Sequence, residues 1–491
     1  MFDYEPVAPP RARRGARDDD EGESLQPGFS KEKSGADGGG GSLVASGLAA
    51  REGSRRAGLL KRGHALVYAG LFLFTAVLYF RPYEYLPLPS TLAFWLAIAT
   101  LAVYVPSQLS VEGTLTVRTR EVNLVLVFCA LALVSVPLAI SPGEAWQTFN
   151  DQLFKAALMF IIIVNAVRTE RRLHGLFFLA LAVSCTLSFA AISDFREGNF
   201  SVEGYRVKGL LGGMFGNPND LALHLVTMIP LALALLLAAK GGLKKIVYAS
   251  CAALFACAVI VTFSRGGFLG LACGLTVLVW QAGRRHRFAV LGLTAAALVG
   301  LLLLAPGSYA ERIVSIVDFA KDPVGSATMR QQLFWRSVFT SIANPVFGVG
   351  IGNFHHVSVR EQESHNAFTQ VSSEMGLPAL AVYVLFILSA MKSLRRVERE
   401  TEGGKRPARA YYLAVGLQAS LVAYCVSSFF ASVAYQWYVY YLVGYAVAVS
   451  RMHAASASAA TNDALDKKLS PGEPDDGRRA RLGLEEAAAR T

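Results

Sequence analysis

The chain has 491 residues, of which 53% are hydrophobic and 17% charged, and its mean hydropathy is +0.39. Soluble proteins carry about a quarter charged residues, so this composition indicates an integral membrane protein surrounded by membrane lipids. A net charge of +11 is also found in proteins that bind nucleic acid. The basic residues lie mostly in short loops between apolar runs, as in membrane proteins, so we expect no nucleic-acid partner.

The two ends of the chain differ in composition from its middle. Residues 1–62 are rich in Gly, Arg, Asp and Glu and nearly free of aromatic residues, which predicts a disordered tail. The first apolar run begins only after residue 63 and lacks the small-residue cleavage pattern of a signal peptide. We therefore expect a transmembrane domain at 63–451, followed by a second disordered tail at 452–491.

Apolar runs of membrane-spanning length, which is about 20 residues, recur between these tails. They predict an all-α, polytopic fold with about twelve transmembrane helices and one long loop at 306–364 that carries amphipathic helices. The predicted spans are 64–80, 89–107, 121–140, 152–167, 173–193, 219–239, 244–263, 266–282, 287–305, 366–391, 410–430 and 433–450.

The distribution of Lys and Arg predicts the orientation of these spans. Basic clusters precede the first span and fill the loops at 118–120, 168–172, 240–245, 284–287 and 392–409, whereas 141–151 and 431–433 hold no Lys or Arg. By the positive-inside rule, both termini are cytoplasmic and the 306–364 loop is extracytoplasmic. The even-numbered spans then begin at the outer face, where a helix N-terminus offers unpaired N–H groups to an anion.

The sixth span starts with "GNPNDLALH". Asn217 is placed to cap the helix, Pro218 suits its first turn, and Asp220 falls where a carboxylate favours the helix dipole. A well-capped helix accounts for Asp220 more simply than catalysis does.

The eighth span starts with "SRGG". Ser264 is a candidate cap, and Gly266 and Gly267 allow backbone N–H groups to approach a ligand closely. Arg265 by itself would be explained by snorkelling to lipid phosphates, and it gains significance from other basic residues on the same side.

The external loop contains an apolar pattern of helical period around Met329, Leu333, Val338 and Ile342, which predicts an amphipathic helix carrying Arg330. The "GVGIG" run at 348–352 follows this helix rather than a strand, which excludes a phosphate-binding NTPase loop.

The tenth span opens at His365 and Asn366, with Ser364 or Glu363 available to cap it. Glu374 lies further along the same span, and an acidic residue within a membrane segment is a candidate functional residue.

These stretches together resemble the O-antigen ligase and polymerase superfamily of bacterial polysaccharide-assembly proteins. The resemblance rests on "GNPNDLA", "SRGG", Arg330 with Trp335 running into "NPVFGVGIGNF", and "HNAF" followed by "EMGLPAL". It covers residues 210–390, and the order and spacing of the blocks are more specific than any single block.

The resemblance implies a metal-independent glycosyltransferase without cofactors. Its donor would be a glycan linked to undecaprenyl pyrophosphate, used at the outer side of the inner membrane, and its acceptor lipid A–core, a protein hydroxyl or another carrier-linked repeat. By motif, Arg265 and Arg330 match pyrophosphate-contacting arginines and His365 the proposed catalytic histidine. The further candidates for substrate binding are Asn217, Asn219, Asp220, Gly266, Gly267, Trp335, Asn366 and Glu374.

The chemistry of these residue types agrees with that function. Arginine makes two-point contacts with phosphate, and histidine is a base of near-neutral pKa for an acceptor hydroxyl. No pair of acidic residues with metal-binding spacing occurs on the outer face, and the six cysteines lie within apolar runs, so we expect neither a metal nor disulfides. A polymerase, a glycan-lipid transporter and a structural scaffold remain alternatives.

Overall fold

The computed structural model describes residues 64–89, 91–200, 206–207, 215–282, 288, 326–402 and 409–469. Every long element among these residues is a helix, which confirms the all-α fold class. Seven of the described helices are long and apolar enough to cross a membrane, whereas the sequence predicts about twelve spans. The 1–62 tail, residues 306–325 and all but one residue of the expected span 287–305 lie outside the described residues.

The helices follow the chain order of the predicted spans, and short 3-10 and π segments (η) separate some of them. Their bounds are His64–Phe80, η1 Pro82–Glu84, α2 Leu92–Glu112, α3 Arg120–Ser135, α4 Pro142–Thr148, η2 Phe149–Phe154, α5 Lys155–Ala166, α6 Glu170–Glu197, α7 Pro218–Ala238, α8 Gly242–Val261, α9 Arg265–Ala282, α12 Ser326–Ala343, η5 Phe354–Val357, η6 Val359–Glu361, α13 Ala367–Thr401, α14 Arg409–Ser428 and α15 Trp437–Leu469. α15 thus continues beyond the expected domain boundary at 451.

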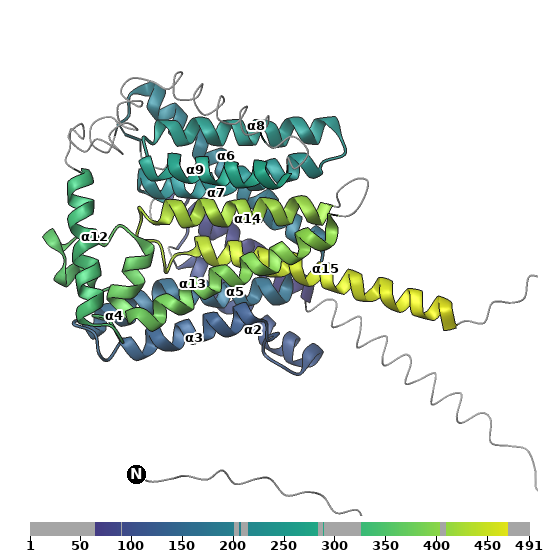
Figure 1. Ribbon diagram of the computed structural model, residues 1–491, viewed down its shortest axis with the longest axis horizontal. Helices are drawn as coiled ribbons and strands as arrows, with labels where there is room; N and C mark the ends of the chain where they lie inside the picture. The colour runs from purple at the N-terminus through teal and green to yellow at the C-terminus, as the bar shows by residue number, and fades with distance from the viewer. Residues whose placement is uncertain are drawn as a thin grey trace, which may run out of the picture. The chain divides into compact units, whose positions relative to one another are not determined.

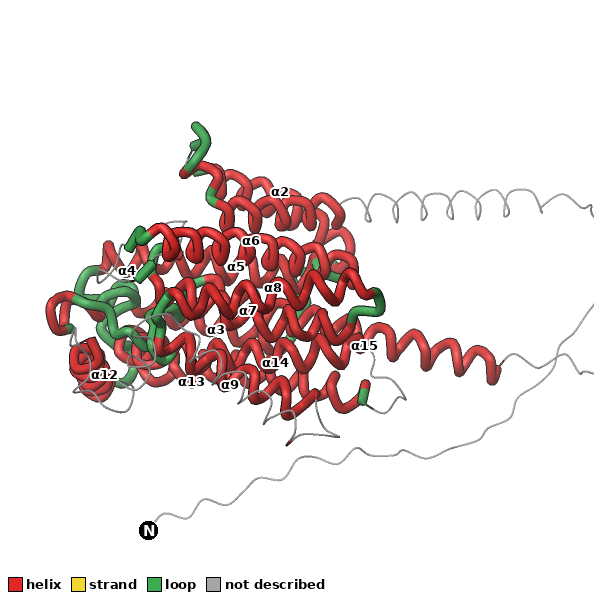
Figure 2. Tube along the Cα trace, turned by 90° about the horizontal axis from the view of Figure 1, so that it is seen from above, coloured by secondary structure: helices red, strands yellow, loops and turns green. Residues whose placement is uncertain are grey.

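The long helices lie side by side, and α12 is the exception. In Figure 1 α12 runs across the ends of α7, α9, α13 and α14, and Figure 2, turned by 90°, shows α12 nearly along its own axis. The part of the 306–364 loop predicted to be an amphipathic helix is the helix α12, which covers one end of the bundle.

The core of the bundle is built around α15. Its aromatic residues Tyr440, Tyr441 and Tyr445 are almost fully buried. The Tyr441 hydroxyl is 2.8 Å from the Thr75 hydroxyl, so its polar end has a partner inside the apolar core. This core fixes the helices whose ends carry the polar motifs.

The packing of α9 against α14 depends on a row of glycines at four-residue spacing. A Cβ at Gly266 would come within 2.9 Å of Phe430, one at Gly270 within 1.9 Å of the Ser427 hydroxyl, and one at Gly274 within 2.9 Å of Ala423. Small residues at this spacing let helix backbones approach closely in membrane proteins. Gly266, the first glycine of the "SRGG" motif, therefore places the start of α9 directly against the residues at and just after the end of α14.

The Gly-rich run at 348–352 packs against a break in the helix α13. Gly376 adopts φ 85° and ψ 173° inside α13, which interrupts the helical hydrogen bonds two residues before Pro378. The carbonyls of Ser373 and Glu374 accept instead from Val349 N at 2.9 Å and Gly350 N at 2.8 Å. The "GVGIG" run therefore completes the hydrogen bonding of a broken membrane helix, which supports its exclusion as a nucleotide loop.

The contact at Gly376 predicts a large effect of adding one methyl group. A Cβ there would lie 2.2 Å from the Val346 carbonyl oxygen, whereas a Cβ at Gly113, which also has a positive φ, would have nothing within 4 Å. Gly376→Ala should destabilise the protein by roughly 2–6 kcal/mol and Gly113→Ala by about 1 kcal/mol, measured as thermal unfolding in detergent. Equal effects would show that the turn does not depend on this close approach.

Candidate functional site

A pocket of about 340 Å³ lies where the N-terminal ends of α9 and α13 meet α12 and the end of α14. Arg265, Arg330 and His365, the three residues predicted to be catalytic, all line it. Among the described residues that line this pocket, none is acidic, and the full set is Arg265, Leu269, Arg330, Gln331, Phe334, Ser364, His365, Asn366, Phe429 and Phe430. A cationic pocket with aromatic walls fits an anionic group attached to an apolar or sugar moiety.

The start of α9 holds Arg265 inside the protein. Ser264 caps the helix as predicted, because its hydroxyl accepts from Gly267 N at 3.2 Å. Arg265 is the first helical residue and only 9% exposed. A side chain buried in a pocket wall does not have the exposure expected of an arginine that snorkels to lipid phosphates.

Arg330 reaches the pocket from α12, the helix that crosses the end of the bundle. The ring of Phe334, one turn further along, packs against Phe429 with centroids 5.8 Å apart. Trp335 and Phe339 are 51% and 60% exposed on α12. Trp335 therefore lies outside the residues that line the pocket, on a face suited to contact with lipid.

His365 sits in a tight turn just before α13. Its φ of 51° is in the left-handed region, which is costly for a residue with a side chain. Its backbone N–H donates to the Ser432 hydroxyl at 2.9 Å, which helps to hold this conformation. The cap of α13 is Asn366 rather than the expected Ser364 or Glu363, because only the Asn366 side chain accepts from Phe368 N and Thr369 N.

The environment of His365 keeps its imidazole neutral. Burial lowers its pKa to about 4, and the positive charge of Arg330 acts in the same direction. A neutral imidazole at physiological pH has a free nitrogen that can accept a proton. The start of a helix would also disfavour the imidazolium, but burial is the larger cause of the lowered pKa in the structure.

The polar start of α7 lies next to the pocket and is used mainly for helix packing. Asn217 caps α7 as predicted by accepting from Asn219 N at 2.9 Å. The Asn219 side-chain oxygen accepts from the Ser264 hydroxyl at 3.1 Å and from Arg206 at 2.9 Å. The bond from Ser264 ties the start of α7 to the start of α9, and the bond from Arg206 ties it to the segment before α7.

Three other residues predicted to bind substrate, Asp220, Gly266 and Gly267, do not line the pocket. Asp220 interacts electrostatically with Glu363 and Arg330, which places it near the pocket, although it does not line it. Gly267 packs against Ala222, and Gly266 packs against Phe430. Close helix packing therefore accounts for both glycines.

Glu374 is buried in α13 at the helix break. Its carboxylate accepts from Gly352 N at 2.8 Å. It does not line the pocket, and its contact instead fixes residues 348–352, called the external turn after their predicted side of the membrane, against α13. Glu374 therefore stabilises the structure next to the pocket without contacting the pocket itself.

Arg206 is a buried residue that was not predicted from the sequence. It is 3% exposed and donates to the Thr262 carbonyl at 2.9 Å as well as to Asn219. It therefore joins the end of α8 to the start of α7. Arg206 precedes the "NPND" sequence without a spacing that is typical of a known motif, so no signal in the sequence indicated its role.

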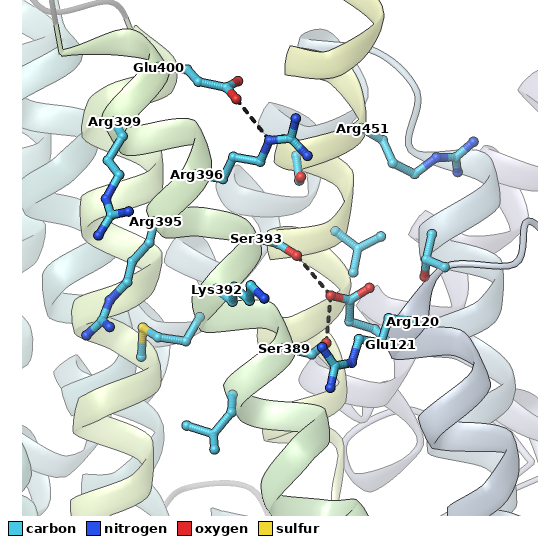
Figure 3. Close-up of a pocket in the computed structure, with 15 residues that line it drawn as sticks. Arg120, Glu121, Ser389, Lys392, Ser393, Arg395, Arg396, Arg399, Glu400 and Arg451 are labelled. Carbon is cyan, nitrogen blue, oxygen red and sulfur yellow. Dashed lines mark hydrogen bonds and ion pairs between the residues drawn. The ribbon is translucent and has the colours of Figure 1, made fainter.

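A second pocket, of about 920 Å³, lies at the opposite ends of the helices and is strongly basic. Figure 3 shows the hydroxyls of Ser389 and Ser393 turned toward Glu121, to which they donate at 2.7 and 3.0 Å. Its cationic lining residues are Arg120, Lys392, Arg395, Arg396, Arg399 and Arg451, and it contains none of the motif residues.

The arrangement defines a multi-pass membrane protein with a cationic pocket at one end of its helices. Residues 250–384 match the family described as O-antigen ligase. This match contains Arg265, Arg330 and His365, and it supports the predicted resemblance to the O-antigen ligase and polymerase superfamily.

Comparison with whole proteins adds little to this family match. A search of the curated proteins found no match. Among solved structures, a chain from work on a peptidoglycan synthase complex that coordinates polymerization and crosslinking is 19% identical, with a TM-score of 0.40. The match covers 68% of this chain and 97% of that one, and a likeness of this degree supports no argument.

The double role of Asn219 predicts a graded response to substitution. Asn219→Ala removes the acceptor of both Ser264 and Arg206 and should cost about 1–3 kcal/mol, whereas Asn219→Asp keeps the acceptor and should cost less. Asn217→Ala, which removes only an exposed cap, serves as the control in thermal unfolding and should cost about 1 kcal/mol. Equal losses for Asn219→Ala and Asn219→Asp would argue against this bridge.

Proposed function

We propose that the protein transfers a glycan from a polyprenyl-pyrophosphate carrier, such as undecaprenyl pyrophosphate, to a hydroxyl of an acceptor. The observation that carries this proposal is the meeting of Arg265, Arg330 and His365 in one pocket. The three residues are separated along the chain and come from α9, α12 and the turn before α13. The family match supports the same class of activity.

The two arginines would bind the pyrophosphate. Negative charge grows on this leaving group as the glycosidic bond breaks, and guanidinium groups in a partly buried pocket stabilise that charge more strongly than they would in water. Phe334, Phe429 and Phe430 line the same pocket and suit the apolar chain or the sugar face of the donor. The charge of the arginines makes this step possible without assigning any role to a metal.

His365 would act as the general base on the acceptor hydroxyl. The hydroxyl oxygen attacks the anomeric carbon as its proton moves to the imidazole, and the carrier pyrophosphate leaves. Binding of the pyrophosphate near Arg330 would offset the charge that lowers the pKa of His365. Donor binding would thus strengthen the base when the acceptor arrives.

The pocket would face the extracytoplasmic side of the inner membrane. The basic pocket at the other end of the helices, with its six Lys and Arg residues, supports this orientation through the positive-inside rule. Both termini would then be cytoplasmic, and α12 would lie along the outer surface.

An O-antigen ligase with lipid A–core or a similar acceptor is the first form of this proposal, and an O-antigen or exopolysaccharide polymerase is the alternative. The glycolipid profile of a deletion strain separates them. Long free polymer with uncapped lipid A–core indicates a ligase, and carrier-linked single repeats indicate a polymerase. An unchanged profile would contradict both.

A glycan-lipid transporter is less well supported. Transporters bind their substrates near the bilayer midplane on broken helices. Here the cationic pocket lies at the helix ends, and the broken part of α13 is occupied by the external turn. This placement favours chemistry at one face.

The two-point contact of arginine with phosphate predicts that lysine is a poor replacement. Arg265→Lys and Arg330→Lys should each lower kcat/KM by roughly tenfold or more in a reconstituted transfer assay, because lysine keeps the charge but loses the planar contact. Arg336→Lys is a matched control on α12, since its Nε donates to the Val357 carbonyl and it does not line the pocket. Full activity of both pocket variants would remove the arginines from donor binding.

A general base at position 365 predicts a loss of turnover with donor binding preserved. His365→Ala should lower kcat by roughly a hundredfold or more, while the affinity for the donor stays near that of the wild type. Because the pKa of His365 before donor binding is about 4, kcat/KM should stay level on acidification well below pH 6.5 and fall only as the pH approaches that pKa. An acid limb near 6.5, or full turnover by His365→Ala, would contradict this role.

A further inference from the structure

Three side chains that take no part in the proposed transfer converge at the outer end of α4. Glu144 on α4 meets His355 and His356 of η5, although 212 positions separate it from the second histidine. One carboxylate oxygen of Glu144 is 3.2 Å from His355 Nε2 and 3.0 Å from His356 Nε2. The two imidazole rings lie with their centroids 4.1 Å apart.

The hydrogen bonds of His355 leave a lone pair directed at this carboxylate. Its Nδ1 is 3.1 Å from the Gly352 carbonyl oxygen, which can only accept, so Nδ1 carries the proton. In a neutral imidazole, Nε2 is then bare, and it faces the Glu144 oxygen at 3.2 Å. An imidazole Nε2 and a carboxylate oxygen are both ligand atoms for zinc, and at this distance one ion can contact both of them.

We propose that Glu144, His355 and His356 bind a divalent transition metal of the zinc class. Their three ligand atoms all lie within 4.8 Å of one another. Ligands around tetrahedral Zn²⁺ are separated by about 3.4 Å, so the carboxylate-to-imidazole distances need little adjustment. Two imidazole nitrogens and one carboxylate favour zinc and its neighbours over Mg²⁺ or Ca²⁺, whose ligands are mainly oxygens.

The surroundings of these ligands are suited to hold them in place. The bond from His355 Nδ1 to a backbone carbonyl is the outer contact that commonly orients a metal-binding histidine. Nearby, Ser141 N donates to the Asn353 side chain at 2.6 Å and Ile140 N to the Val349 carbonyl at 3.1 Å. The histidines and Glu144 remain 31–48% exposed, so an ion can enter and water can complete its coordination.

The metal would join the start of α4 to the external turn. The same turn completes the hydrogen bonds of broken α13 through Val349 and Gly350, and His365 follows in the loop that leads into α13. The ion would therefore stabilise the outer end of the bundle and would take no direct part in glycan transfer.

The test uses the full-length protein in detergent, purified through a tag without histidines and stripped with a chelator. Added Zn²⁺ should bind at one ion per chain, as measured by elemental mass spectrometry, and should raise the unfolding temperature. Co²⁺ should bind in its place and give visible absorption bands. Glu144→Gln and His356→Ala should each weaken Zn²⁺ binding by about tenfold or more.

His174→Ala is the matched control, because His174 Nδ1 also lies against a backbone carbonyl, that of Glu170, at 2.6 Å. It belongs to none of the clusters of potential ligands among the described residues, so its removal should leave Zn²⁺ binding unchanged. Absence of Zn²⁺ binding by the wild type would overturn the proposal, as would Zn²⁺ binding by Glu144→Gln and His356→Ala as tight as that of the wild type. None of these measurements depends on glycan transfer.

Discussion

Two arginines that share one partly buried pocket are the constraint on which the site depends. Arg265 is almost wholly buried, and Arg330 acts on His365 strongly enough to contribute to its lowered pKa. Like charges in such a place repel each other, and Asp220, which interacts electrostatically with Arg330, lies outside the residues that line the pocket. We propose that the pyrophosphate of the donor lowers this repulsion when it binds.

The helix packing is what forces these charges together. The glycine row of α9 brings its first turn against Phe430, which follows the end of α14, and Asn219 ties the start of α9 to α7. On the other side, the break at Gly376 lets the external turn dock onto α13. The turn then leads through η5 and η6 to His365. The three residues proposed as catalytic thus rest on close backbone contacts that tolerate few larger residues.

Much of the fold and the main site residues could be predicted from the sequence because they follow local rules. Apolar runs identified the helices, and capping chemistry identified Asn217 and Ser264 correctly. The convergence of Arg265, Arg330 and His365 followed from placing three helix starts on one face and from the family resemblance. The roles of these residues stay predictions.

Contacts between distant parts of the chain could not be predicted in this way. Glu374 was interpreted as an isolated acid in a membrane span, yet its partner is the backbone of Gly352 in the external turn. Arg206 finds its acceptors on α7 and at the end of α8, and Glu144 meets two histidines that are distant in the sequence. Such pairs depend on tertiary packing, which hydropathy and spacing do not encode.

The central claim is that the pocket binds the pyrophosphate of a lipid-linked glycan donor. The most direct measurement is an experimental structure of the full-length protein in lipid nanodiscs with undecaprenyl pyrophosphate added. If the donor binds in this pocket, density for both phosphates should lie between the guanidinium groups of Arg265 and Arg330, with Nε2 or Nδ1 of His365 facing the adjoining space. Phosphate density elsewhere, with this pocket filled only by water or lipid tails, would contradict it.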